Sequence, residues 1–253
     1  MLRPEGPTHP LIERVWHAES SSSSGIERVL PTGAMHVVLR LADAPLSLVE
    51  DGGFREVGHA VVGGARSSFY LRLVGGRSRS VGAMLKPGAA RALFGASAEE
   101  LAERHTPLAD LWGRDAELLR DRLATSRDPL AVFVDALSRR LGSTTFDLPV
   151  DPETPVAELV RRSGYSHRAF TEKFRANVGL APKAFAKVQR FQRALALLPS
   201  SPSLAEAAFA AGYADQAHMC RDFAALAGLS PAAYRRLAPA SPNHVDFVQD
   251  ARR

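Results

Sequence analysis

The chain has 253 residues, of which 45% are hydrophobic and 23% charged, an ordinary balance for a soluble protein with room for two domains. No apolar run approaches membrane-spanning length and the amino terminus lacks an apolar signal region, so we expect a cytoplasmic protein without a membrane partner. The single cysteine excludes a disulfide framework and any multi-cysteine metal site.

The charge is distributed unevenly along the chain. The net charge is +5, yet residues 1–151 hold 18 basic against 19 acidic side chains, whereas residues 152–253 hold 14 against 8. The basic excess therefore lies wholly in the second part, as expected for a surface that faces phosphates.

The first part of the chain alternates short β-rich runs with Gly and Pro. The polar run at residues 20–24 is expected to be a mobile loop, and Gly75 with Gly76 marks a boundary between strands. Several short strands at this spacing predict a β-barrel or sandwich. The predicted strands are residues 11–16, 35–41, 46–50, 59–64, 67–74 and the beginning of the segment 80–94.

From residue 98 onward the pattern becomes helical, with apolar residues three and four apart. The segment that follows, at residues 142–152, is rich in turn residues and predicts an interdomain linker. We therefore predict a β-rich sensor or dimerisation domain over residues 1–142, with a helical region at about 98–142, and a linker over residues 143–152.

An internal repeat dominates the rest of the chain. Residues 164–185, GYSHRAFTEKFRANVGLAPKAF, return as residues 212–234, GYADQAHMCRDFAALAGLSPAAY, with one extra residue in the turn. Both copies begin with Gly-Tyr, carry a central phenylalanine (Phe174 and Phe223) and have Gly-Leu-x-Pro near their end. A repeat of this length indicates one structural unit used twice.

Local signals predict helix, tight turn, helix in each copy. Thr154 is expected to cap a helix that starts at Pro155, and Ser203 with Glu206 predicts a capping box for a helix from about Leu204. A glycine in each copy is expected to end this helix in the left-handed conformation, and a polar residue after it to cap the next helix. These four residues are Gly164, Gly212, Ser166 and Asp215.

The second helix of each copy has one apolar face. Phe170 and Phe174 are four residues apart, as are Met219 and Phe223, so these faces are predicted to pack inward. The opposite faces carry Arg, Gln and Thr side chains, which a helix that reads the major groove needs. The predicted DNA-binding residues are Ser166, His167, Arg168, Thr171, Glu172, Arg175, Gln216, Ala217, His218, Cys220 and Arg221.

Individual side chains suggest individual roles. Arg221 suits a bidentate contact with guanine, and Gln216 suits adenine. Glu172 either accepts from a cytosine amino group or forms an ion pair with Arg168 four residues earlier. Cys220 is interpreted as a small apolar filler, with a redox sensor as the alternative.

The two units and the helix between them resemble the DNA-binding domain of the AraC family of bacterial transcription regulators. The resemblance rests on the first motif given above, on the connecting helix KVQRFQRALALL and on the second signature LAEAAFAAGYADQAHMCRDFAALAGLSPAAYRR. It implies an all-α domain at residues 153–238, with a first helix-turn-helix unit at 155–180, a linker helix at 182–198, a second unit at 204–229 and a tail at 239–253.

The amino-terminal half is only loosely similar to the small β-barrel sensor domains found ahead of this module. Together the two halves predict an α+β protein, in which a β-barrel or sandwich-like domain with a helical extension precedes the all-α domain. The resemblance implies a sequence-specific DNA-binding transcription regulator and not an enzyme, with no cofactor and no catalytic residue. The expected partner is double-stranded DNA, read in the major groove over two successive turns. Candidate further partners are a small-molecule effector within residues 1–142, a second copy of the chain and RNA polymerase.

Two alternatives remain open for the amino-terminal half. It either senses a ligand, whose binding residues the sequence does not identify, or serves only for oligomerisation. A cupin-type metalloenzyme fused to a DNA reader is the less favoured alternative, because His36 and His59 are isolated and no H-x-H pair accompanies them. We therefore expect no metal site.

Overall fold

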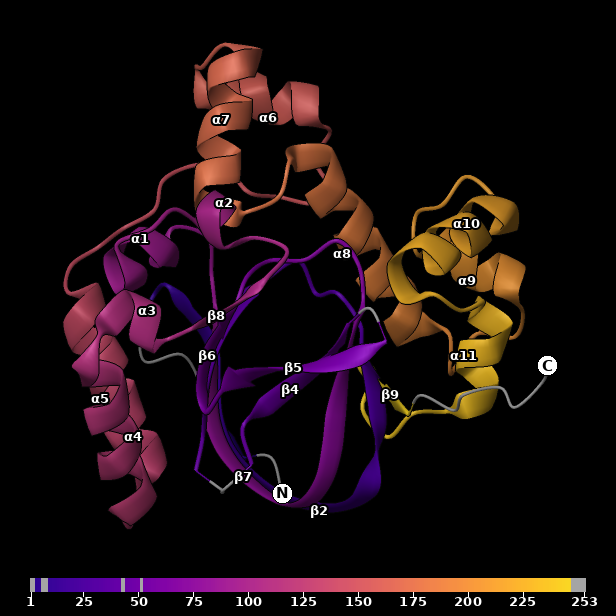
Figure 1. The fold of residues 1–253 in the computed structure, drawn as a ribbon. Helices are drawn as coiled ribbons and strands as arrows, with labels where there is room; N and C mark the ends of the chain where they lie inside the picture. The colour runs from indigo at the N-terminus through magenta and orange to yellow at the C-terminus, as the bar shows by residue number, and fades with distance from the viewer. Residues whose placement is uncertain (1–2, 6–8, 42–43, 51, 247–253) are drawn as a thin grey trace.

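The computed structural model describes residues 3–5, 9–41, 44–50 and 52–246. Within these ranges nine strands form one antiparallel sheet that curls into a nearly closed barrel (Figure 1). The order is β1-β2-β7-β3-β6-β8, with β4 paired to β5 and β7, and β9 paired to β2. The strands are β1 (Arg3–Glu5), β2 (Ile12–Val29), β3 (Met35–Arg40), β4 (Leu46–Glu50), β5 (Gly53–Gly58), β6 (Ala60–Gly63), β7 (Tyr70–Leu85), β8 (His105–Pro107) and β9 (His244–Asp246).

The longest strand pair, β2 with β7, shows that two sequence predictions were wrong. The serine run expected to be a mobile loop lies inside β2, where Ser20 pairs with Ser78 and Ser22 with Gly76 of β7. The predicted strand boundary at the two glycines likewise lies inside β7. Backbone hydrogen bonds between neighbouring strands do not depend on the polarity of the side chains, so a polar run remains in register. Gly75 permits a close approach of the chains, because a Cβ there would lie 2.9 Å from the Cα of Ser24.

Helices on one side of the barrel belong to the first half of the chain (Figure 1). The buried face of α5 contains Leu130, Phe133, Leu137 and Leu141, as the apolar spacing predicts. The helical pattern is interrupted by β8, which pairs with β6 and was not predicted. These helices are α1 (Ala89–Phe94), α2 (Ala98–Leu101), α3 (Ala109–Trp112), α4 (Arg114–Thr125) and α5 (Pro129–Leu141).

The second half of the chain is helical up to residue 237, and Figure 1 shows it above the barrel and along its right side, opposite α4 and α5. Its helices are α6 (Val156–Ser163), α7 (His167–Val178), α8 (Pro182–Leu197), α9 (Leu204–Ala210), α10 (Gln216–Ala227) and α11 (Pro231–Leu237). The predicted α+β fold class is therefore confirmed. None of the helices in the described ranges is long and apolar enough to cross a membrane.

The hydrophobic core joins the two halves. One large cluster contains Leu39 and Val81 of the barrel, Phe133 of α5, Phe191 of α8 and Phe223 of α10. The first helix-turn-helix unit has a smaller cluster of its own, built on Leu159, Phe170, Phe174 and Val178. The second unit thus shares its core with the barrel, whereas the first is packed mainly around itself.

The segment predicted as a tail contains a strand. β9 extends the sheet beside β2, and the backbone N–H of Leu30 donates to the carbonyl of Asn243 at 2.9 Å. Next to this strand, Glu27 accepts from Arg72 at 2.5 Å and lies 3.2 Å from His244. Burial alone would raise the pKa of Glu27, but the hydrogen bond with His244 and the charge of Arg72 outweigh it and lower the pKa to about 2. The rest of the predicted tail, residues 247–253, lies outside the described residues.

Candidate nucleic-acid interface

The first unit begins one residue later than the sequence suggests. Thr154 does not cap α6; its hydroxyl donates to Asp151 at 2.5 Å, and Pro155 occupies the position before the helix. The carboxylate of Asp151 also accepts from the backbone N–H of Glu153, so Thr154 is held in the turn before the helix and Pro155 occupies the N-cap position. Gly164 ends α6 at φ 71°, in the left-handed region as predicted.

The caps of the two second helices agree with the sequence. Ser166 accepts from the backbone N–H of Ala169 at 3.3 Å, and Asp215 accepts from that of His218 at 2.6 Å. Each capped helix, α7 or α10, is 12 residues long and ends at a left-handed glycine. We call α7 and α10 the reading helices.

The predicted capping box of the second unit is half formed. Ser203 accepts from the backbone N–H of Glu206 at 3.1 Å, so α9 begins at Leu204 as expected. The Ser203 hydroxyl then donates to the Glu206 carboxylate at 3.0 Å, which uses that carboxylate in place of the reciprocal bond to the backbone.

The structure places the predicted DNA-binding residues on the outer faces of the reading helices or at their caps. Phe170, Phe174, Met219 and Phe223 are fully or almost fully buried on the inner faces. Eight predicted residues are exposed: Ser166, His167, Arg168, Glu172, Arg175, Gln216, Ala217 and Arg221. The other three, Thr171, His218 and Cys220, are half-buried.

The basic side chains of the two reading helices differ in their partners. On α7, Arg168 pairs with Glu172 at 2.9 Å, and Arg175 pairs with Glu99 of α2 at 2.7 Å. On α10, Arg221 and Gln216 form no hydrogen bond or ion pair with any part of the chain that the structure describes. A ligand such as DNA meets Arg221 without first breaking an ion pair, whereas Arg175 must leave Glu99.

A buried carboxylate fixes the second reading helix. Asp222 of α10 is 6% exposed and lies 3.1 Å from the amine of Lys187, 3.4 Å from Arg190 and 3.8 Å from His218. The ring of His218 also contacts Tyr213 edge-to-face at 5.1 Å between ring centroids. Because Lys187 and Arg190 belong to α8, this cluster ties α10 to the helix between the units.

Asp222 was not predicted from the sequence as a positioning residue. A signal was present, because Asp222 is three residues after Met219 on the inward face, where a charge needs a partner. The two cations three residues apart on α8 supply that partner, but only the packing of α8 against α10 shows that they meet.

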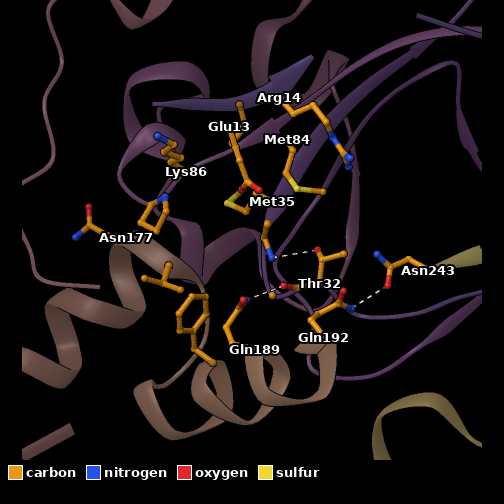
Figure 2. A pocket seen from close by; sticks show the side chains of 16 residues that line it. Glu13, Arg14, Thr32, Met35, Met84, Lys86, Asn177, Gln189, Gln192 and Asn243 are labelled. Atoms are coloured by element: carbon orange, nitrogen blue, oxygen red, sulfur yellow. Dashed lines mark hydrogen bonds between the residues drawn. The ribbon is translucent and has the colours of Figure 1, made fainter. Parts of the chain in front are cut away.

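A cavity of about 480 Å³ separates the barrel from the first unit and α8 (Figure 2). At its rim Gln189 donates to the carbonyl of Thr32 at 2.9 Å, and Gln192 donates to the side-chain oxygen of Asn243 at 2.8 Å. Its wall mixes apolar and charged side chains from both halves of the chain: Met35, Met84, Val178, Phe185, Arg14, Glu13 and Lys86.

No group of three or more His, Cys, Asp or Glu side chains that could hold a metal ion occurs in the described ranges. His36, one of the two histidines considered in the sequence, lies beside His105, with ring centroids 6.2 Å apart.

Two capped helix-turn-helix units in one chain, each with its apolar face buried and polar side chains on the outside, define a DNA-binding protein. The comparison with protein families agrees: residues 159–237 match the family described as a helix-turn-helix domain, which is of the AraC type. Residues 159–237 therefore form an AraC-type helix-turn-helix domain, the DNA-binding domain of a transcription regulator. Residues 1–107 match a second family, described as Domain of unknown function (DUF6597).

Solved structures of ToxT from Vibrio cholerae are similar to this chain at low sequence identity. The structure from strain O395 is 10% identical and has a TM-score of 0.45, and the match covers 90% of this chain and 98% of ToxT. ToxT of strain SCE256 with bound unsaturated fatty acid is 11% identical with a TM-score of 0.44, over 87% of this chain and 94% of ToxT. No curated protein matches the sequence.

Proposed function

We propose that this regulator reads two successive major grooves on one face of duplex DNA, one with α7 and the other with α10. The observation that carries this proposal is the pair of equivalent reading helices, each exposing the face that the repeat aligns. They are connected by α8, whose 16 residues span about 24 Å at 1.5 Å per residue. With the width of the units added, this length is compatible with grooves about 34 Å apart on the duplex.

We propose that the two units make different kinds of contact with DNA. Residues 153–198 hold nine basic against three acidic side chains, whereas residues 199–238 hold three of each. The first unit and α8 therefore bind mainly phosphates, and the second unit reads bases with Gln216 and Arg221.

Removing positive charge from the first unit should flatten the dependence of DNA affinity on salt. In the double variant Arg168→Ala, Arg175→Ala, the loss of two phosphate contacts makes the negative slope of log K against log salt shallower by about 1.8, and binding to any sequence weakens. Fluorescence anisotropy titrations at several salt concentrations measure this slope. Gln216→Ala is the neutral control, with an unchanged slope and an altered base preference. Equal slopes for the double variant and the parent would contradict the proposed docking face of α7.

We propose that residues 1–142 sense a small effector in the cavity between the halves, since its wall includes both the barrel and the DNA-binding part. A bound molecule there touches Met84 of the barrel and Phe185 of α8 at once, and so favours one arrangement of the two parts. In the runner-up, residues 1–142 only form a homodimer. The proposed setting is the bacterial cytoplasm, where the chromosome and RNA polymerase are.

A thermal-shift screen of small metabolites tests the effector. A molecule that occupies the cavity at roughly 100 times its Kd should raise the melting temperature by about 5–10 °C. The variant Met84→Trp, which fills the cavity, should lose this rise, whereas Leu118→Trp on the exposed face of α4 should keep it. An equal rise in melting temperature in both variants would show that the molecule binds outside the cavity. No stabilising molecule, together with a dimer in sedimentation experiments, would favour the runner-up.

A further inference from the structure

One short loop contacts both helix-turn-helix units. Residues 64–69 connect β6 to β7, and Ala65 lies at the end of α7, where a Cβ added to Gly179 would be 3.1 Å from the Ala65 Cβ. Phe69 lies at the end of α10, where a Cβ added to Gly228 would be 2.5 Å from the Phe69 ring. The backbone N–H of Phe69 also donates to the carbonyl of Leu226 at 2.9 Å.

The two contacts use equivalent positions of the repeat. Gly179 and Gly228 align with each other, and both end a reading helix in the left-handed conformation, with φ 93° and 63°. Only a residue without a side chain allows the loop to approach this closely while the backbone holds that conformation. The loop therefore touches the carboxyl ends of both reading helices, away from the caps and outer faces predicted to meet DNA.

The loop is anchored between its two contacts. Glu103 accepts from the backbone N–H of Ser67 at 2.8 Å and from its hydroxyl at 2.5 Å, and the carbonyl of Glu103 accepts from Arg66 at 2.8 Å. Glu103 holds this position at φ 58°, a conformation that a non-glycine residue adopts only when its contacts compensate for the strain. Arg28 of β2 covers the ring of Phe69, with its guanidinium 4.8 Å from the ring centroid. Ala65 and Phe69 are thus held at a fixed separation.

We propose that residues 64–69 form a bridge that couples the two units and sets the spacing between the reading helices. The bridge, α7, α8 and α10 form a closed ring of packed elements, so the barrel imposes one placement on both units. A disturbance at the Phe69 contact is transmitted to the Gly179 contact, although these belong to different units. This goes beyond the proposed function, because it concerns how the reading helices are placed and not what they bind.

Hydrogen exchange tests the coupling without DNA. Phe69→Ala removes the ring at the second unit, and we expect backbone amides near Gly179 in the first unit to exchange about three- to tenfold faster as well. Glu103→Gln, which weakens the anchor of Ser67 and keeps the fold, should give the same effect at a smaller size. Phe54→Ala, at a side chain 64% exposed on β5, is the control and should leave both units unchanged. Faster exchange confined to the second unit in both Phe69→Ala and Glu103→Gln would overturn the proposal.

A DNA experiment tests the spacing. Duplexes are first selected from a random pool by the full-length parent protein, and footprinting locates the two segments that the protein protects. Two base pairs are then inserted between these segments. We expect the insertion to weaken parent binding at least tenfold and Phe69→Ala binding about threefold or less, since the variant tolerates other spacings. An equal loss in both proteins would show that α8 alone sets the spacing, and the bridge proposal would fail while the DNA-binding function stood.

Discussion

Replacing Arg221 with alanine is expected to weaken binding to the cognate duplex by about 1–3 kcal/mol and to relax the preference at one base position. Arg221 is exposed on the outer face of α10, and the described part of the chain gives it no ion-pair partner. We therefore expect its guanidinium to contact a base edge without giving up an earlier interaction. Arg175 differs, because DNA binding must first replace its contact with Glu99.

Affinities for selected and random duplexes at one salt concentration measure the effect. Arg236→Ala is the matched control, because it removes the same charge from an exposed position on α11. We expect Arg221→Ala to lose affinity mainly on the selected duplex, and Arg236→Ala to lose a similar, smaller amount on both. If Arg221→Ala lost equally on selected and random DNA, Arg221 would be a phosphate contact and not a base reader.

Acidification from pH 6.5 to 4.5 is expected to lower the free energy of unfolding by about 2–4 kcal/mol through two histidines of the barrel. Burial, and the nearby charges of Arg72, His244 and Arg66, lower the pKa of His36 to about 4. Burial, followed by the charges of His36, Arg66, Arg55 and Arg72, lowers the pKa of His105 to about 3.

Because the pKa values of His36 and His105 are lowered in the folded protein, acidification destabilises the fold. The folded protein keeps both rings neutral, whereas the unfolded chain binds protons below about pH 6.5, so protons favour unfolding. The stabilisation is complete above pH 6.5 and is lost as the pH falls towards the folded-state pKa values. The lowered pKa of Glu27 adds a second loss, between its ordinary value of 4.5 and about 2, which overlaps only the lower end of the histidine window.

Urea denaturation at several pH values checks this expectation. His105→Phe replaces the ring with one that does not titrate, and it should remove roughly half of the loss between pH 6.5 and 4.5. His167→Gln removes an exposed histidine from α7 and is the control, with the pH profile of the parent. A profile for His105→Phe that matches the parent's would mean that His105 does not carry the proton-linked loss.

The carboxy-terminal units could be predicted closely from the sequence because their signals are local. Ser166 and Asp215 cap the reading helices through backbone N–H groups three residues away, and Gly164 turns the chain within its own unit. The four-residue spacing of Phe170 and Phe174 likewise depends only on the helical period. The repeat doubled each of these signals. The fold class and the DNA-binding role therefore follow from the amino-acid sequence alone.

Contacts between distant parts of the chain were decided only by the tertiary structure. The serine run became part of β2 because β7, far along the chain, supplied hydrogen-bond partners, with Ser20 opposite Ser78. Part of the predicted tail forms β9 because it pairs with the end of β2, at Glu27–Val29. Sequence spacing carries no information on which strand edges or charged side chains meet across such distances.

The same reason separates the local features of the interface from the long-range ones. The sequence by itself determined which side chains lie on the outer faces of α7 and α10, since one helix fixes them. Only the packed molecule decided that Arg175 pairs with Glu99, that Asp222 ties α10 to α8, and that one loop meets both Gly179 and Gly228. Local backbone preferences form the reading units, whereas long-range packing between the halves sets where those units are held.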